Sequence, residues 1–202
     1  MNLFHIPKKK KIFVFVGHPD NESLNVRLAD AYARGARDQG HEVKRVNIGD
    51  MHFDPILHKG YRAIQELEPD LKQFQEDMRW CDHFVIFYPS WWSTMPALLK
   101  GLFDRIWLPG FAFRFEHKGI THGYMWRGML KGKTARVFVT SDSPAILARL
   151  LFGDSTNEIK RGILGFAGIR AKITKIGSLK NATPQDKENL VEKCRHYGKW
   201  AC

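Results

Sequence analysis

Short apolar runs alternate with longer segments of helical periodicity along most of the chain. The apolar runs predict strands at residues 12–16, 41–46, 84–88, 135–140 and 172–176. Apolar residues spaced three or four positions apart predict helices at 24–38, 70–80, 96–107 and 158–166, and a last helix opening with a cap-like pattern at 183–186. Strands that alternate with helices predict a parallel sheet covered on both faces.

This order predicts an α/β, flavodoxin-like, doubly wound fold with a five-stranded parallel sheet. In that order the ligand site lies between the first and third strands, beyond their carboxyl ends. The connections 47–68 and 108–133 lack a sustained period, and long irregular loops are often functional. We expect a basic tail at 1–10 and one domain at 11–202. Lys100 and Arg105 are expected on the solvent side of their helix.

The composition is typical of one globular domain. The chain has 202 residues, of which 44% are hydrophobic, and a domain of this size buries roughly 70% of its unfolded surface. It contains no run of about 18 apolar residues that would predict a membrane span, and its first residues lack the apolar core of a signal peptide. The three cysteines form no C-x-x-C pair, and the nine histidines show no metal-ligand spacing. We therefore expect a cytoplasmic protein with no metal site and no membrane insertion.

The net charge of +11 raises nucleic acid or anionic lipid as partners. No predicted helix carries a continuous Lys/Arg stripe, so the charge is expected to be spread over solvated faces and to attract an anionic cofactor. No nucleic-acid partner is expected. A basic nucleic-acid binder remains an alternative, although it leaves the aromatic loop described next without a role.

That aromatic loop follows the buried strand 84–88. The strand ends at Pro89, and a helix is predicted to start at Pro96 after a loop that contains Trp91 and Trp92. Neighbouring side chains of an extended segment point to opposite faces, so both indoles cannot enter one core. At least one indole is therefore expected to face a ligand at the carboxyl end of the strand. A flat aromatic cofactor would suit that position.

The loop after the first strand, residues 17–25, has features that suit a phosphate. It is neither G-x-G-x-x-G nor a Walker sequence. It does bring His18, Ser23 and Asn25 to the predicted N-terminus of a helix, where free N–H groups favour anions. The alternative is that Ser23 is a simple N-cap and His18 a turn residue.

Together, the two loops resemble the NAD(P)H:quinone oxidoreductase family, the DT-diaphorase-like flavoproteins that include the bacterial modulator of drug activity B. The motifs are G-H-P-x-x-x-S-x-N at 17–25 and Y-P-x-W-W-x-x-M-P-A-x-L-K-G-x-x-D-R at 88–105. Further similarity lies at 75–83, 108–114 and 149–153. The family also includes ancillary oxidoreductases of glutathione-gated potassium efflux.

The resemblance implies a tightly bound FMN or FAD, NAD(P)H as reductant, a quinone-like small-molecule acceptor and a homodimer. It assigns cofactor contacts to His18, Ser23, Leu24, Asn25, Gln75, Pro89, Ser90, Trp91, Trp92, Thr140, Ser141, Asp142 and Ser143. The first four would hold the phosphate and ribitol. The loop 89–92 would wrap the isoalloxazine, and 140–143 would meet its other edge.

The chain departs from the animal quinone reductases in two places. Its loop 140–143 lacks their glycines, and segment 145–149 lacks the Tyr and His that assist hydride transfer in those enzymes. No catalytic acid or base is therefore assigned. In the long connection, Phe111 and Phe113 are expected to belong to the core, and Tyr124 and Trp126 either line the acceptor pocket or are structural.

The family also suggests an alternative of another class. Because of the potassium-efflux relatives, the chain could be a flavodoxin-like regulatory subunit of a transporter or channel. Its basic surface would then meet an acidic partner domain.

Overall fold

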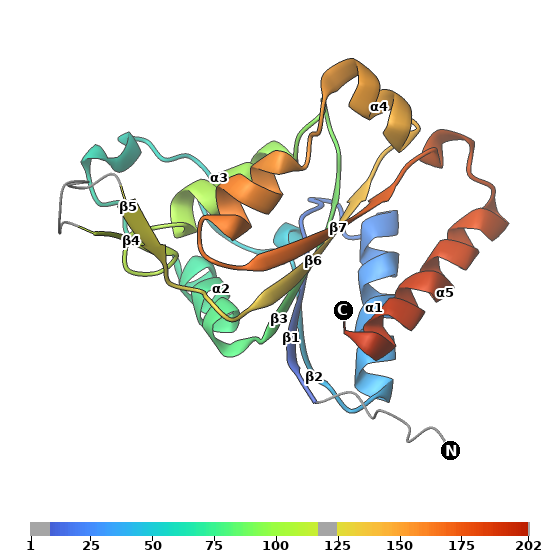
Figure 1. The fold of residues 1–202 in the computed structure, drawn as a ribbon, viewed down its shortest axis with the longest axis horizontal. Coiled ribbons are helices and arrows are strands. Elements are labelled where there is room, and N and C mark those ends of the chain that lie inside the picture. The colour runs from blue at the N-terminus through green and yellow to red at the C-terminus, as the bar shows by residue number, and fades with distance from the viewer. Residues whose placement is uncertain (1–8, 117–124, 202) are drawn as a thin grey trace.

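The computed structural model describes residues 9–116 and 125–201. Its main sheet has five parallel strands in the order β2-β1-β3-β6-β7 (Figure 1). The strands are β1 Lys11–Val16, β2 Glu42–Asn47, β3 His83–Pro89, β6 Thr134–Thr140 and β7 Arg170–Ile176. All seven residues of β3 are buried, as a central strand covered on both faces requires. The predicted flavodoxin-like α/β fold is confirmed.

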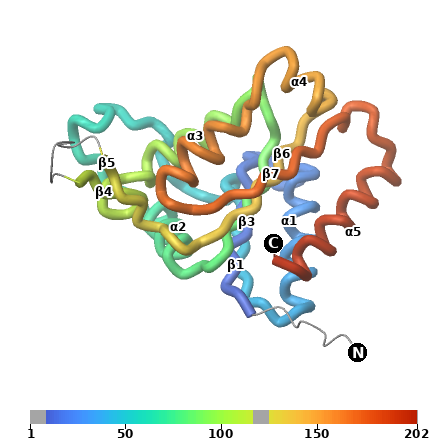
Figure 2. Tube along the Cα trace, viewed as in Figure 1, coloured from blue at the N-terminus to red at the C-terminus, as the bar shows by residue number. Residues whose placement is uncertain are grey.

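Helices cover both faces of this sheet. Figures 1 and 2 show α1 (Leu24–Asp38) and α5 (Pro184–Trp200) on one side, and α2 (Pro69–Trp80) and α3 (Ala97–Ile106) on the other. The segment predicted as a helix at 158–166 is a π-helix, η3 (Glu158–Gly165), and it lies on the second side. Short 3₁₀ turns occur at η1 (Ile48–Asp50), η2 (Gly60–Arg62) and η4 (Leu179–Asn181). The predicted cap of the last helix is a complete capping box between Thr183 and Asp186.

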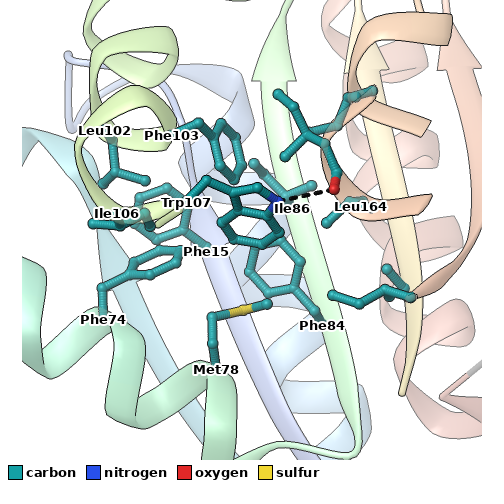
Figure 3. Close-up of a cluster of buried hydrophobic side chains, with 14 of the residues drawn as sticks. Phe15, Phe74, Met78, Phe84, Ile86, Leu102, Phe103, Ile106, Trp107 and Leu164 are labelled. Carbon is teal, nitrogen blue, oxygen red and sulfur yellow. Dashed lines mark hydrogen bonds between the residues drawn. The ribbon is translucent and has the colours of Figure 1, made fainter. Parts of the chain in front are cut away.

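The core on the α2–α3 side is rich in aromatic residues. The rings of Phe13, Phe15 and Phe84 on the sheet pack against Phe74 of α2, with centroids 4.9–6.2 Å apart. Trp107, at the end of α3, donates its indole N–H to the carbonyl oxygen of Ile163 in η3 at 2.9 Å (Figure 3). A buried indole N–H needs such a partner. This bond therefore ties α3 to η3 above the sheet.

On the other side, α1 and α5 approach closely because glycines lie at their contact. A Cβ atom added to Gly35 would lie 1.9 Å from the carbonyl oxygen of Arg195, and one added to Gly198 would lie 2.0 Å from that of Tyr32. Neither distance is compatible with a real side chain. The two glycines therefore set the distance between the helix backbones.

The connection 108–133 is more regular than its sequence predicts. It contains an antiparallel hairpin of β4 (Phe113–Glu116) and β5 (Met125–Gly128). Trp126 stacks on Phe166 with centroids 4.3 Å apart and donates its indole N–H to the Phe166 carbonyl at 3.0 Å. Phe111 is buried, and Phe113 packs against the same core, so their predicted core role is confirmed.

The expectation that Arg105 faces solvent is wrong. Its side chain is 1% exposed and lies under the connection between β2 and α2. The guanidinium donates to the carbonyls of Asp54 and Glu66 and to both carboxylate oxygens of Glu68, at 2.8 and 3.1 Å for the carboxylate. Burial raises the pKa of Glu68, but hydrogen bonds from Arg105 and from the Asp54 N–H outweigh it and hold that pKa below its usual value. Lys100 does lie near the surface, paired with Asp104.

A further helix, α4 (Ala145–Phe152), was not predicted. It projects at the carboxyl edge of the sheet (Figure 1), and none of its eight residues is buried.

No helix among residues 9–116 and 125–201 is both long and apolar enough to cross a membrane. Of the predicted tail at 1–10, only Lys9 and Lys10 fall within the described residues.

Candidate functional site

A cleft of 610 Å³ lies at the carboxyl edge of the sheet, at the ends of β3 and β6. It is lined by Pro89, Ser90, Trp91, Trp92, Ser93, Thr140, Ser141, Asp142, Ser143, Ala148, Phe152 and Leu179. The lining includes both segments that the sequence assigns to the flavin ring, 89–92 and 140–143. The cleft lies beyond the carboxyl ends of the strands, where an open α/β sheet binds ligands, but at β3 and β6 rather than between β1 and β3 as predicted.

Thr140 connects the parts of this site. Its backbone carbonyl accepts a 2.7 Å hydrogen bond from the N–H of Ser90. Its hydroxyl accepts a 3.1 Å bond from the side-chain amide of Asn25, in the first turn of α1. Asn25 and Thr140 are 4% and 3% exposed. The Asn25 side chain therefore holds α1 against β6.

The N-terminus of α1 has an unpartnered hydroxyl. Ser23 has the extended backbone of an N-cap residue, but its side chain makes no capping bond. Its Oγ atom is buried and has no hydrogen-bond partner among the described residues. The first turn of α1 contains no acidic residue. A buried hydroxyl beside the free N–H groups of a helix start is suited to an anion such as a phosphate.

His18 links the first loop to the aromatic loop. Its ring meets the Trp91 indole edge-on, with centroids 5.4 Å apart and an interplanar angle of 77°. Its Nδ1 accepts a 2.9 Å hydrogen bond from the N–H of Asp20. His18 is thus a turn residue, as one interpretation of the sequence has it, and also lies beside the cleft.

The two tryptophans sit on a tight turn. The N–H of Trp91 donates to the Thr94 carbonyl at 2.9 Å, and the N–H of Thr94 returns a 3.1 Å bond to the Trp91 carbonyl. The central residues Trp92 and Ser93 have φ angles of 51° and 63°, in the left-handed region. Such a conformation costs about 1–2 kcal/mol per non-glycine residue, and residues held in it cluster at ligand sites.

This turn determines where each indole lies. Trp91 is 44% exposed beside the cleft, whereas Trp92, at the apex, is fully exposed. The Thr94 hydroxyl donates a 2.6 Å bond to Glu158 at the start of η3, which fixes the end of the turn. Neither indole enters the core, in agreement with the argument from their adjacency.

Two predicted residues, Gln75 and Trp126, lie away from this cleft. The Gln75 amide is buried between α2 and α3, where it donates to the Ile106 carbonyl at 2.9 Å. Trp126 lies on the β4–β5 hairpin against Phe166. Tyr124 falls outside the described residues.

Sequence reasoning missed Ala148 and Phe152 of α4, and Ser93 and Leu179, as cleft residues. Composition was the one signal in the sequence for α4, because the segment 145–152 is apolar apart from one arginine.

Across the described parts of the chain, no group of three His, Cys, Asp or Glu side chains could hold a metal ion. Cys81 and Cys194 are free and buried, and burial raises the pKa of each thiol to about 12.

Comparisons with known proteins agree with this fold. Residues 10–200 match the protein family described as a flavodoxin-like fold. The chain is 25% identical over 130 residues to the uncharacterized NAD(P)H oxidoreductase YcaK of Escherichia coli, covering 62% of this chain and 66% of that protein. It thus spans slightly less than two thirds of that relative's length. It is also 24% identical over 209 residues to human ribosyldihydronicotinamide dehydrogenase [quinone], covering 90% and 87%.

A solved structure is similar over nearly the whole chain. The NAD(P)H:quinone oxidoreductase of Methanothermobacter marburgensis has a TM-score of 0.76 and 21% identity, and the match covers 95% of this chain and 98% of that one. At this identity the likeness shows the fold. Because the family match extends over nearly all of the chain, the chain belongs to the family of proteins with the flavodoxin-like fold.

Proposed function

We propose that this chain is a flavin-dependent NAD(P)H oxidoreductase that reduces a quinone or a similar aromatic acceptor. The observation that carries the proposal is the cleft at the ends of β3 and β6, with the orphaned Ser23 hydroxyl at the nearby start of α1. The names of YcaK and of the human relative support the same activity. Because these relatives are named as oxidoreductases, a regulatory subunit is not favoured.

The residues present fit a flavin, either FMN or FAD. The Ser23 hydroxyl and the N–H groups of Leu24 and Asn25 would hold its phosphate. Trp91 and the backbone of 89–92 would lie along one side of the ring, and Thr140, Ser141, Asp142 and Ser143 along the other edge. Gln75 is not part of this proposal, because its amide is already bonded within the core.

Hydride transfer from NAD(P)H to the acceptor is the chemistry that the flavin supplies when bound. The chain itself binds and orients the reactants. The Asn25–Thr140 and Ser90–Thr140 bonds keep the cleft walls in register, and the fixed turn at 91–94 positions an indole wall. Such positioning can supply a large part of a rate enhancement without a protein acid or base.

We further propose that the protein is a cytoplasmic homodimer. The α4 helix has no buried residue and exposes an apolar surface, with Leu150 79% and Leu151 65% exposed. Trp92 extends from the same edge of the sheet. Apolar surface of this kind on a soluble chain indicates a protein contact. Sedimentation equilibrium of the wild type and of Leu150→Glu tests the proposed dimer. A monomeric wild type would contradict it.

The activity is tested by following NADH or NADPH oxidation on addition of a simple quinone, with FMN or FAD supplied. Wild type should turn over, whereas Trp91→Ala should bind flavin more weakly or be reduced more slowly. Trp200→Ala removes an exposed indole at the far end of α5 and is the matched control. Flavin binding and turnover in Trp91→Ala equal to those of the control would remove Trp91 from the site.

A further inference from the structure

A second hollow adjoins α4, on a face of that helix next to the one that lines the cleft. It has a volume of 330 Å³ and is formed by α4, the loop after it, η3 and β7. Its lining consists of Ala145, Ile146, Arg149, Asp154, Thr156, Lys160, Ile173 and Lys175. Three cations therefore face one carboxylate.

This hollow has more positive charge than its single carboxylate can neutralise. Asp154 accepts a 2.8 Å bond from Lys175, together with bonds of 2.7 and 3.1 Å from the hydroxyl and N–H of Thr156. These bonds hold the pKa of Asp154 well below its usual range, so it is ionised and already neutralised by Lys175. Arg149 and Lys160 form no ion pair with any residue in 9–116 or 125–201. A net charge of two is left without a counterion among the described residues.

Helix α4 borders both the hollow and the cleft. Ala148 of α4 lines the cleft, and its neighbour Arg149 lines the hollow, because successive helix residues point about 100° apart. These two faces of α4 adjoin each other. A ligand with one end in the cleft could therefore place an anionic group in the hollow.

We infer that this hollow binds the 2′-phosphate of a phosphorylated nicotinamide dinucleotide, so that NADPH is preferred to NADH as the reductant. Arg149 would pair with two phosphate oxygens through its planar fork, and Lys160 would add a second charge. The inference rests on the proposed function for the identity of the ligand. The surplus charge in the hollow exists independently of it.

The experiment measures binding of adenosine 2′,5′-bisphosphate by calorimetry to the protein as purified. Adenosine 5′-diphosphate is the second probe, since it carries the same number of phosphate groups without one at the 2′ position. We expect the bisphosphate to bind the wild type more tightly than the diphosphate. Arg149→Gln and Lys160→Gln should each weaken the bisphosphate about tenfold, because each removes a charge-assisted contact.

Lys72→Gln is the matched control. It removes one exposed positive charge from α2, remote from the hollow in the sequence and on a different element. We expect it to leave both affinities unchanged. If Lys72→Gln weakened bisphosphate binding as much as Arg149→Gln or Lys160→Gln does, the effect would come from net charge alone and the inference would be overturned. Equal binding of the two probes by the wild type would overturn it as well.

The inference and the proposed function can fail separately. A protein that binds flavin and oxidises NADH and NADPH with equal KM, but shows no preference for the bisphosphate, retains the proposed function and loses the 2′-phosphate site. A protein that takes up no flavin, but binds the bisphosphate through Arg149 and Lys160, keeps the anion site and loses the proposed function.

Discussion

Asn25 and Thr140 lie 115 residues apart in the chain, and their side chains meet in a buried 3.1 Å hydrogen bond between the start of α1 and the end of β6. Each residue has few alternatives to this partner, because both are almost fully buried. The bond therefore couples the α1 N-terminus, where Ser23 lies, to the cleft walls at Ser90 and Ser141.

A double-mutant cycle with Asn25→Ala and Thr140→Val should reveal this coupling. Each single change leaves a buried polar partner unsatisfied, and should lower the free energy of unfolding by about 1–3 kcal/mol. The double variant should lose less than the sum by roughly 0.5–2 kcal/mol. Urea unfolding measures the three variants. Strictly additive losses would mean that the bond does not couple the two elements.

Arg105→Met should be strongly destabilising. The change leaves Glu68 and two backbone carbonyls of the connection between β2 and α2 without their hydrogen-bond donor. Breaking such a buried pair lowers the free energy of unfolding by about 3–5 kcal/mol. Lys100→Met, on the same helix, removes an exposed pair with Asp104 and should cost under about 1 kcal/mol. Chemical denaturation compares the two. Similar small losses would contradict the buried position of Arg105.

Gly35→Ala should lower stability by about 1–3 kcal/mol, because the new methyl group must push α5 away from α1. Gly162→Ala serves as the control, since its added Cβ would meet no other group within 4 Å apart from its own helix backbone and chain neighbours. Thermal unfolding of both variants is the measurement. If the Gly35→Ala protein unfolded at the same temperature as the control, the helices would not be in close contact.

Stability should fall with pH below about 6.5 because of His83. Burial, followed by the charges of Lys10 and Arg136, lowers the pKa of this imidazole from 6.5 to about 3. Between these values the unfolded chain binds a proton that the folded chain does not, so the stabilisation is complete above pH 6.5 and is lost as the pH falls. One such proton gives a slope of at most about 1.4 kcal/mol per pH unit.

His83→Leu should flatten this dependence in urea titrations carried out from pH 7.5 to pH 4.5. His52→Leu, at an exposed position, controls for the loss of an imidazole. An unchanged slope in His83→Leu would assign the acid sensitivity to other groups.

Much of the fold could be predicted because periodicity reports burial. The five strands were found within a few residues of their observed bounds, since each is a short run with its apolar residues concentrated together. Helix α4 was not found, because it buries no face and so has no amphipathic period. The β4–β5 hairpin was missed because both of its strands are only four residues long.

Local sequence could predict only part of the candidate cleft. The loops 17–25 and 89–92 follow strands, and their residue types suit a phosphate and a flat ring. The burial of Arg105 and the Gln75–Ile106 bond depend on which distant segments fold over them. Local spacing contains no information about such contacts. The left-handed turn at Trp92 and Ser93 could not be predicted either, because neither residue type favours that conformation.

The most direct test of the proposed function is the visible absorption spectrum of the purified protein, followed by acid release and mass measurement of any chromophore. We predict a yellow protein that releases FMN or FAD, with lower flavin content in Ser23→Ala than in Trp200→Ala. A colourless protein that also takes up neither added FMN nor added FAD would contradict the proposed flavin site and the oxidoreductase activity derived from it.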